Sequence, residues 1–428
     1  MAIMLCSNVL HIGFLSCYFY FSALATILNP WVSFQLPSAH FSTLFSLPSN
    51  GLATQDYFDS EYEVASNQAH RCSEFASNLK LPNTTYAYSS YHAAKESLSL
   101  AGTIQSCGGS NLKAAIPNDL CRVIVDVSTT NFSNVRVEAW LPSDWNSRIL
   151  ASGVGGIGGC VDYNILQMGT QLRFASFGTN AGHNGSAGYD FFLNKPEVLN
   201  DFGWRGVHTE AIVAKEIVQQ YYGNPVSKSY YAGCSSGGRL GFRTAMDYPE
   251  DFDGLLLGAP GVNWIRVVSS KGILARRSGW PNITSPAYVR DEQWNAIVKE
   301  QIRQLDSLDG VSDSIIDDPS VLRFDPEILA CGGGVVDDNV CLNPQQVETV
   351  RRVYEPIADS SRKIVYPSFE LGSNPGVFSI NQRDGKPYLN YEILTVSQYW
   401  NRDEMLLLNL RYRTSIEARC ITNQSGRP

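Results

Sequence analysis

The sequence predicts an α/β fold, and three observations support this. From Cys72 onward, short apolar runs alternate with turns marked by Gly and Pro, a pattern typical of α/β domains. The segment 207–222 has clear helical periodicity. A strand, a glycine-flanked turn and a helix follow one another around Ser235. With 428 residues, the chain is long enough for one large domain or for a core domain with a substantial insertion.

The N-terminal segment 1–25 is predicted to be a signal peptide. It is apolar and holds no charged side chain, because the first acidic residue is Asp56. The small residues Ala23 and Ala25 match the pattern of a signal-peptidase site. The stretch 9–28 is also long enough to cross a bilayer as an uncleaved anchor. We expect cleavage, and no membrane attachment after it.

The core domain is predicted over residues 71–265, after a poorly ordered lead-in over 26–70 that shows no sustained period. Its first clear strand covers 148–151, which is a buried apolar run. This strand leads into a glycine-rich loop over 153–160, and a second strand is predicted over 173–177.

The next elements are predicted in the order helix, strand, helix, strand. In 207–222, apolar side chains recur at spacings of four and three, which predicts a helix with one buried face, ended by Gly223 and Pro225. The elements after it are an aromatic-rich strand over 229–232, a helix over 239–248 and a buried strand over 255–257.

Charge and cysteine content restrict the class of protein. The net charge is −8, only 17% of residues are charged, and no run of Lys or Arg occurs, so nucleic acid is not an expected partner. Of the ten cysteines, Cys6 and Cys17 lie in the predicted leader, and the remaining eight indicate disulfides formed in an oxidising compartment. Five glycosylation sequons agree with export and begin at Asn83, Asn131, Asn184, Asn282 and Asn423.

The turn Gly233-Cys234-Ser235-Ser236-Gly237 predicts a nucleophilic serine. In α/β-hydrolases such a serine is exposed on a strained strand-to-helix turn, where small flanking residues are needed. The backbone N–H of Ser236 would stabilise an oxyanion, and the glycine-rich loop at Gly155 and Gly156 would supply the second donor. The alternatives for this loop are a tight turn that needs positive φ angles and, more distantly, a dinucleotide site.

The residues around this turn resemble the tannase and feruloyl esterase family. The resemblance rests on the sequence from Tyr230 to Arg239, with Cys directly before Ser235, and on Tyr248-Pro249-Glu250-Asp251-Phe252-Asp253-Gly254. It implies an α/β-hydrolase core sheet, here incomplete, with an inserted lid domain, and residues 266–428 would comprise this lid and a truncated C-terminal remainder. It also implies a Ser-Asp-His triad that hydrolyses esters of aromatic acids such as ferulate or gallate. The implied disulfides are Cys72 with Cys121, Cys107 with Cys160, and Cys331 with Cys341.

An acidic loop in the predicted lid is a candidate Ca²⁺ site. Asp306, Asp309 and Asp313 surround a glycine, and oxygen-rich loops of this kind bind Ca²⁺, although composition alone favours a solvated acidic turn. The resemblance reverses that preference. It implies a structural Ca²⁺ held by the three Asp side chains and by the carbonyl groups of Val311 and Ile315. The disulfide that usually flanks this loop is replaced here by Leu305 and Leu322.

The acid and the base of the triad are not recognisable. All six histidines precede Ser235, whereas the hydrolase order is Ser, acid, His. The general base is therefore unknown. His183 is the one substitute to test, because it follows a core strand, whereas His208 is expected to pack or cap the helix. Cys420 could pair with Cys234, but Arg419 stands where the family places its histidine.

These observations predict a secreted, extracellular serine carboxylesterase that forms an acyl-enzyme on Ser235. Its expected substrate is a small aromatic ester or an ester of the plant cell wall or of a polyphenol. Because the acid and the histidine are missing, we expect a C-terminally truncated and impaired copy. The alternative, from another functional class, is a secreted binding protein that keeps the aromatic-ester cleft without the chemistry.

Overall fold

The structure is a computed structural model that divides into two units. It describes residues 2–6, 53–186, 192, 194–262, 277, 282, 284–319, 322–333, 337–358, 361–375, 382–383 and 386–387. The first unit combines Met1–Asn184 with Glu197–Pro260, and the second combines Gly185–Pro196 with Gly261–Pro428. The division after Pro260 lies close to the predicted boundary between residues 265 and 266.

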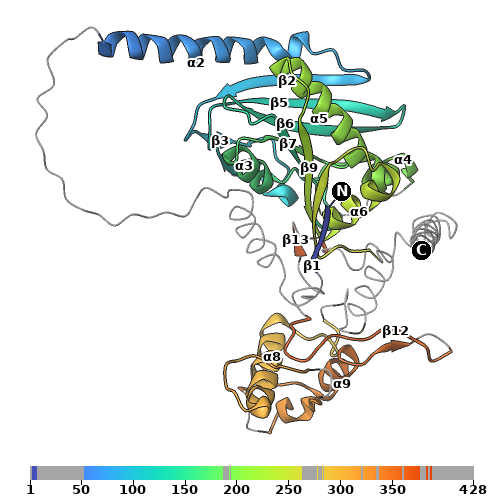
Figure 1. The fold of residues 1–428 in the computed structure, drawn as a ribbon. Coiled ribbons are helices and arrows are strands. Elements are labelled where there is room, and N and C mark those ends of the chain that lie inside the picture. Colours follow the sequence, from blue (N-terminus) through green and yellow to red (C-terminus); the bar gives the residue numbers. More distant parts are fainter. Residues whose placement is uncertain are drawn as a thin grey trace, which may run out of the picture. The chain divides into compact units, whose positions relative to one another are not determined.

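The first unit is built on an eight-stranded mixed sheet with the order β1-β10-β9-β7-β8-β6-β5-β2 (Figure 1). The run from β1 to β8 is parallel, and the pairs that involve β6, β5 and β2 are antiparallel. The strands are β1 (Ala2–Cys6), β2 (Thr84–His92), β5 (Leu120–Thr130), β6 (Ser133–Pro142), β7 (Arg148–Ser152), β8 (Ala175–Thr179), β9 (Lys228–Cys234) and β10 (Gly254–Gly258). The predicted α/β fold is confirmed.

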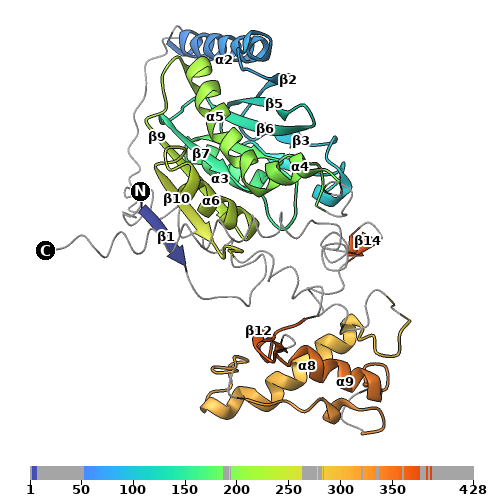
Figure 2. The same ribbon diagram turned by 90° about the vertical axis from the view of Figure 1, so that its right-hand side faces the viewer.

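Helices cover both faces of this sheet (Figure 2). The helix α3 (Tyr163–Gln171) packs on Ala232 of β9, and α6 (Ser236–Asp247) packs Gly241 against Tyr231. Because neighbouring side chains of a strand point to opposite faces, α3 and α6 lie on opposite sides. The other elements are α5 (Gly206–Tyr222), α4 (Pro196–Asn200), the π-helical turn η2 (Asp201–Arg205), η1 (Gln105–Cys107), β3 (Ser97–Ser99) and β4 (Lys113–Ala115).

The N-terminal region differs from its prediction. A helix, α2, runs from Ala53 to Asn78, so the expected poorly ordered lead-in is wrong for residues 53–70. This helix is held near its end by the disulfide between Cys72 and Cys121 and by Phe75, whose ring meets Tyr221 edge-on at 5.1 Å. Such long-range contacts leave no signal in local periodicity.

The predicted leader lies mostly outside the described residues. Its start, Ala2–Cys6, forms β1, which pairs in parallel with β10 at the edge of the sheet. The expected cleavage site at Ala23 and Ala25 and the lead-in over 26–52 lie outside the described residues. Among the helices that the structure describes, none has the length and apolar character needed to cross a membrane.

The second unit has a small helical core. Its buried residues gather around Trp294 of α8 (Asp291–Leu305) and Val347 of α9 (Pro344–Val353). The disulfide between Cys331 and Cys341 closes the segment between the two helices. The remaining elements are η3 (Asp306–Asp309), η4 (Pro326–Leu329), β11 (Ile357–Ala358), β12 (Ile364–Tyr366), β13 (Gln382–Arg383) and β14 (Lys386–Pro387).

Candidate active site

Ser235 lies on a strained turn between β9 and α6. Its backbone has φ 58° and ψ −115°, a conformation that residues other than glycine rarely adopt. The backbone N–H of Ser235 donates a hydrogen bond to the carbonyl oxygen of Gly258 at 2.9 Å, which ties the turn to β10. Ser235 is exposed although its neighbours Gly233 and Ser236 are buried. The turn therefore presents one hydroxyl to solvent from a rigid support.

The flanking glycines are required by close backbone packing. A Cβ atom on Gly233 would lie 2.6 Å from the carbonyl carbon of Gly237. A Cβ atom on Gly238 would lie 2.7 Å from the carbonyl oxygen of Gly258. Contacts this short are not compatible with a Cβ atom. Only glycine therefore fits at these two positions, where the first turn of α6 approaches the sheet closely.

The glycine-rich loop over 153–160 packs against this turn. A Cβ atom on Gly153 would lie 2.8 Å from the Cα atom of Gly237, so the two backbones are in direct contact. The hydroxyl of Ser236 donates a hydrogen bond to the carbonyl oxygen of Gly156. Gly155 is exposed, and Gly156 has a φ of 61°. The structure thus brings together Ser235, Ser236 and the two glycines that were expected to form an oxyanion hole.

His183 anchors the far end of the glycine-rich loop. Its Nε2 lies 2.7 Å from the carbonyl oxygen of Ile157, so Nε2 carries the proton and donates it. A Cβ atom on Gly159 would lie 2.1 Å from the backbone oxygen of His183. Burial lowers the pKa of His183 from 6.5 to about 4, so the ring is neutral at physiological pH. His183 makes no hydrogen bond with Ser235, and its geometry supports a structural role.

The other described histidines also lie in contacts of their own. His208 pairs with Asp251, with Nδ1 and Oδ2 2.8 Å apart, and stacks on Tyr248 at 3.7 Å, in agreement with the expected packing role. His92 contacts Ser90 and Glu96, and His70 contacts Glu74. Within the described residues, no side chain accepts a hydrogen bond from Ser235 Oγ. His11 and His40 lie outside this part of the chain.

The three disulfides implied by the resemblance are all present. Cys72 is bonded to Cys121, Cys107 to Cys160, and Cys331 to Cys341. The bond at Cys160 closes the end of the glycine-rich loop. Cys234, directly before Ser235, is also disulfide-bonded. Cys420 and Arg419, which were considered in connection with Cys234, lie outside the described residues.

The acidic loop over 306–315 contains carboxylate and carbonyl oxygens of the kind that bind Ca²⁺, but its acidic side chains are not arranged as a metal site. One oxygen of Asp309 accepts the N–H of Val311 at 2.8 Å, and one of Asp313 accepts the N–H of Ile315 at 3.0 Å. Asp306 accepts the N–H of Asp313 at 3.1 Å. Carboxylate and carbonyl oxygens suit Ca²⁺. However, no three acidic, His or Cys side chains in the described residues are arranged as a metal site, so calcium stays a prediction.

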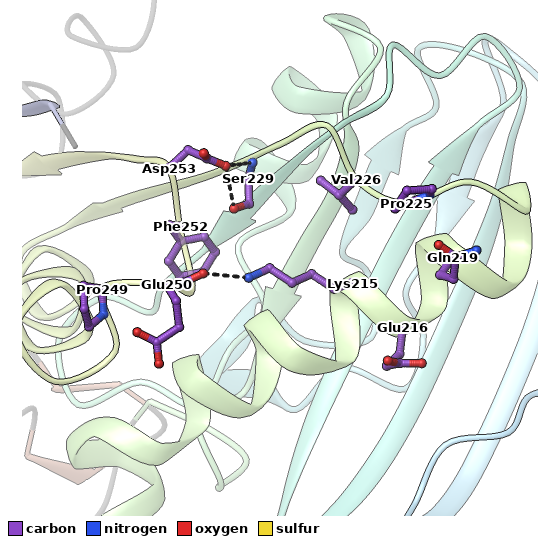
Figure 3. Close-up of a pocket in the computed structure, with 10 residues that line it drawn as sticks. All are labelled: Lys215, Glu216, Gln219, Pro225, Val226, Ser229, Pro249, Glu250, Phe252 and Asp253. Carbon is purple, nitrogen blue, oxygen red and sulfur yellow. Dashed lines mark hydrogen bonds between the residues drawn. The ribbon is translucent and has the colours of Figure 1, made fainter.

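A cavity of about 570 Å³ is lined by residues near the start of β9 (Figure 3). Ser235 directly follows the other end of this strand. Ser229, near the start of β9, and Lys215 of α5 both line it. Lys215 Nζ donates to the carbonyl oxygen of Glu250 at 3.0 Å, and the hydroxyl of Ser229 donates to Asp253 at 3.1 Å. Because these polar groups pair with one another and β9 separates them from the nucleophile, this cavity is not part of the candidate active site.

Two ionisable residues near the turn were not predicted as parts of the site. Arg239 of α6 donates to the carbonyl oxygens of Gly203 and Phe202, and burial lowers its pKa to about 10. Glu210 of α5 is fully buried and accepts the backbone N–H of Ser152 at 3.3 Å. A signal for Glu210 was present in the sequence, since it interrupts the apolar face of the helix over 207–222.

Comparison with known proteins places these features in a family context. The sequence model described as tannase and feruloyl esterase matches residues 121–382, more than half of the chain. A "Probable feruloyl esterase B-2" of Aspergillus terreus is 36% identical over 337 residues, covering 79% of this chain and 61% of the relative. For a "Probable feruloyl esterase B" of Emericella nidulans the identity is 38% over 306 residues, with 71% and 56% covered. The chain thus spans about three-fifths of the length of these relatives.

Solved structures confirm the α/β-hydrolase core. Feruloyl esterase B from Aspergillus oryzae superposes with a TM-score of 0.66 at 32% identity, covering 81% of this chain and 70% of that one. Tannin acyl hydrolase from Aspergillus niger has a TM-score of 0.52 at 19% identity, covering 76% and 62%, which supports the fold alone. The resemblance seen in the sequence is confirmed by both kinds of comparison.

Proposed function

The chain belongs to the tannase and feruloyl esterase family, and on this premise we propose that it is a serine carboxylesterase acting through Ser235. The proposed substrates are esters of aromatic acids, of the feruloyl or galloyl type, from the plant cell wall or from polyphenols. One observation carries the proposal: Ser235 is exposed on a strained strand-to-helix turn, and the glycine-rich loop packs directly against that turn.

The proposed chemistry is acyl transfer in two steps. The hydroxyl oxygen of Ser235 attacks the ester carbonyl carbon while its proton passes to a base, and the alcohol leaves with a proton as the acyl-enzyme forms. Water then attacks the acyl-enzyme and releases the acid. The N–H groups of Ser236 and of the loop at Gly155 and Gly156 would stabilise the oxyanion in each step.

We propose further that the 428-residue chain is impaired as an esterase when tested alone. All six histidines precede Ser235 in the sequence, and each described one is held in a contact away from the Ser235 hydroxyl. Without a base the hydroxyl remains a weak nucleophile, and only the oxyanion donors and substrate binding would contribute to the rate. The same observation favours the alternative of a non-catalytic binding protein.

The proposed location is extracellular, after cleavage of residues 1–25, which would remove the edge strand β1 from the sheet. The disulfides joining Cys72 to Cys121, Cys107 to Cys160, and Cys331 to Cys341 support passage through an oxidising compartment. Mass spectrometry of the protein secreted by a eukaryotic host tests this location, because the mature chain should begin at Thr26. Retention inside the cell with residues 1–25 still attached would contradict it.

A structural Ca²⁺ is also proposed for the second unit. The side chains of Asp306, Asp309 and Asp313 would hold it, together with the carbonyl oxygens of Val311 and Ile315. Its role would be to neutralise three neighbouring carboxylates and to stiffen the loop, with no part in the ester chemistry.

Hydrolysis and binding of methyl ferulate and methyl gallate test the proposed function together. We expect both esters, or one of them, to raise the melting temperature, and turnover to be slow and without a burst. Ser235→Ala should preserve binding, and Ser77→Ala, at an exposed position on α2, serves as the control.

The outcomes separate the hypotheses. Rapid hydrolysis abolished by Ser235→Ala would confirm the nucleophile and contradict the impairment. Binding with turnover no faster than the uncatalysed reaction would favour the non-catalytic binder. The absence of both binding and turnover for every aromatic ester would contradict the proposed substrate class.

A further inference from the structure

Glu210 is a buried acid without a matching cation. It lies on the core-facing side of α5 and has no solvent exposure. In the part of the chain that the structure describes, its Oε2 has no hydrogen-bond partner, and no Lys, Arg or His side chain forms an ion pair with it. A charged carboxylate in such surroundings would be very costly, so the side chain is best accommodated as the neutral acid.

The contact that Glu210 does make is at the start of the glycine-rich loop. Its Oε1 accepts the backbone N–H of Ser152, the last residue of β7, at 3.3 Å. The next residue, Gly153, is the one whose backbone touches Gly237 at the nucleophile turn. The backbone N–H that Glu210 holds therefore belongs to the residue directly before the contact that joins the loop to the turn.

A second buried contact lies on the same side of the sheet. Tyr231 of β9 donates its hydroxyl to the carbonyl oxygen of Gly237 at 2.8 Å, and a Cβ atom on Gly153 would lie 1.9 Å from that hydroxyl. The titratable groups that interact electrostatically with Tyr231 are Glu210 of α5 and Arg239 of α6. Gly153 of the loop, Gly237 of the turn and Glu210 thus lie in one buried region.

We propose that Glu210 is a positioning residue which, as a neutral acid, holds the glycine-rich loop beside Ser235 by accepting the backbone N–H of Ser152. This inference rests on the proposed function, since the loop matters for catalysis only if it supplies oxyanion donors. The placement of the loop itself can be measured without catalysis. Burial raises the pKa of Glu210 well above its ordinary value of 4.5, which agrees with the neutral form.

Three substitutions test the role of Glu210. Glu210→Gln keeps an oxygen that can accept the Ser152 N–H and cannot become charged. Glu210→Met is apolar and removes the acceptor. Glu216→Gln, at an exposed position of the same helix, controls for the loss of one carboxylate from α5.

Hydrogen exchange gives the first readout, in peptides covering 150–160 and, for comparison, the β5–β6 hairpin. We expect Glu210→Met to raise exchange at least tenfold in 150–160 and to leave the hairpin unchanged, with Glu210→Gln close to the wild type. Equal exchange in 150–160 for the wild type and Glu210→Met would overturn the proposal. So would a Glu210→Gln variant that loses protection as fully as Glu210→Met.

The pH dependence of unfolding gives the second readout. Because the acid is neutral in the folded state, the wild type loses stability as pH rises from about 4.5 toward the folded pKa. The unfolding equilibrium constant of the wild type should rise up to tenfold per pH unit relative to Glu210→Gln. A constant ratio between pH 4.5 and pH 9, equal to that of Glu216→Gln, would contradict a neutral Glu210.

Hydrolysis of methyl ferulate, where the chain supports it, gives the third readout. Glu210→Met should lower kcat with little change in KM, because oxyanion donors act in the transition state. If every variant, the wild type included, is inactive, the non-catalytic binding protein is favoured over the esterase, while the exchange and pH experiments still decide the role of Glu210.

Discussion

The glycine-rich loop over 153–160 and the acidic loop over 306–315 were both predicted as functional from a local pattern, and they differ in what holds them. The first is held by residues far away in the sequence, including His183, Glu210 and Tyr231. The hydrogen bonds of the acidic side chains in the second all stay within the loop. Only the first loop is brought into contact with another predicted site residue.

The two loops show that local composition and long-range contacts give different information about a site. A glycine-rich or acidic stretch identifies a loop, because these residues favour turns for local reasons. Long-range contacts then decide whether the loop is placed against chemistry. The glycine-rich loop meets this condition, since its backbone touches the turn of Ser235, whereas Val311 and Ile315 in the acidic loop are 54% and 62% exposed.

The largest effect on stability is expected from protonation of His183 at acid pH. Burial lowers its folded pKa from 6.5 to about 4, so the neutral ring stabilises the fold above pH 6.5, and this contribution is lost as pH falls toward 4. The loss should reach about 3 kcal/mol, measured by urea unfolding at several pH values. His183→Gln should unfold more easily at pH 7 but show a flatter dependence between pH 6.5 and pH 4.

His70→Gln is the matched control for this experiment, because His70 lies on α2 with 72% of its side chain exposed. If His183→Gln and the wild type lose stability in parallel between pH 6.5 and pH 4, then His183 does not anchor the glycine-rich loop as a buried neutral ring. The glycine-rich loop would then lack one of the long-range contacts that distinguish it from the acidic loop.

A smaller effect is expected from adding one methyl group to the glycine-rich loop. In Gly153→Ala the new Cβ would lie 1.9 Å from the Tyr231 hydroxyl and 2.8 Å from the Gly237 backbone, so we expect a loss of about 2–3 kcal/mol. Gly155→Ala is the control, because no atom lies within 4 Å of its Cβ position, and it should change stability by less than about 0.5 kcal/mol. Equal unfolding free energies for the two variants would contradict the close packing of loop and turn.

The smallest effect is expected from calcium at the acidic loop. At a Ca²⁺ concentration ten times the Kd, binding should stabilise the second unit by about 1.4 kcal/mol, and a chelator should reverse this in a thermal unfolding experiment. The double variant Asp306→Asn with Asp313→Asn should lose the response, and Asp317→Asn, at an exposed position nearby, should keep it. A response that survives in the double variant would place any bound calcium elsewhere, and the absence of a response in the wild type would remove the calcium proposal.

Much of the hydrolase core could be predicted from local patterns. The strands predicted over 148–151, 229–232 and 255–257 correspond to β7, β9 and β10, and the helix over 207–222 corresponds to α5. These elements were visible because buried faces repeat with the period of the backbone. The strand predicted over 173–177 was displaced slightly, since β8 begins at Ala175.

The long hairpin of β5 and β6 and the helix α2 were not predicted. In β5 and β6 the alternation of buried and exposed residues is present, but the first strand begins beside Cys121, whose importance depends on a partner 49 residues away. The helix α2 is joined to β5 by the same disulfide. A short stretch of sequence does not show which distant residue such an element contacts.

For this chain, the sequence alone identified Ser235 and the glycines around it, because a strained turn restricts which residues can occupy it. Tertiary structure alone decided that His183 holds a loop and that Glu210 lies buried at the start of that loop. The physical reason is that periodicity shows which face of an element is buried, whereas the charge state and role of a side chain depend on which distant atoms surround it.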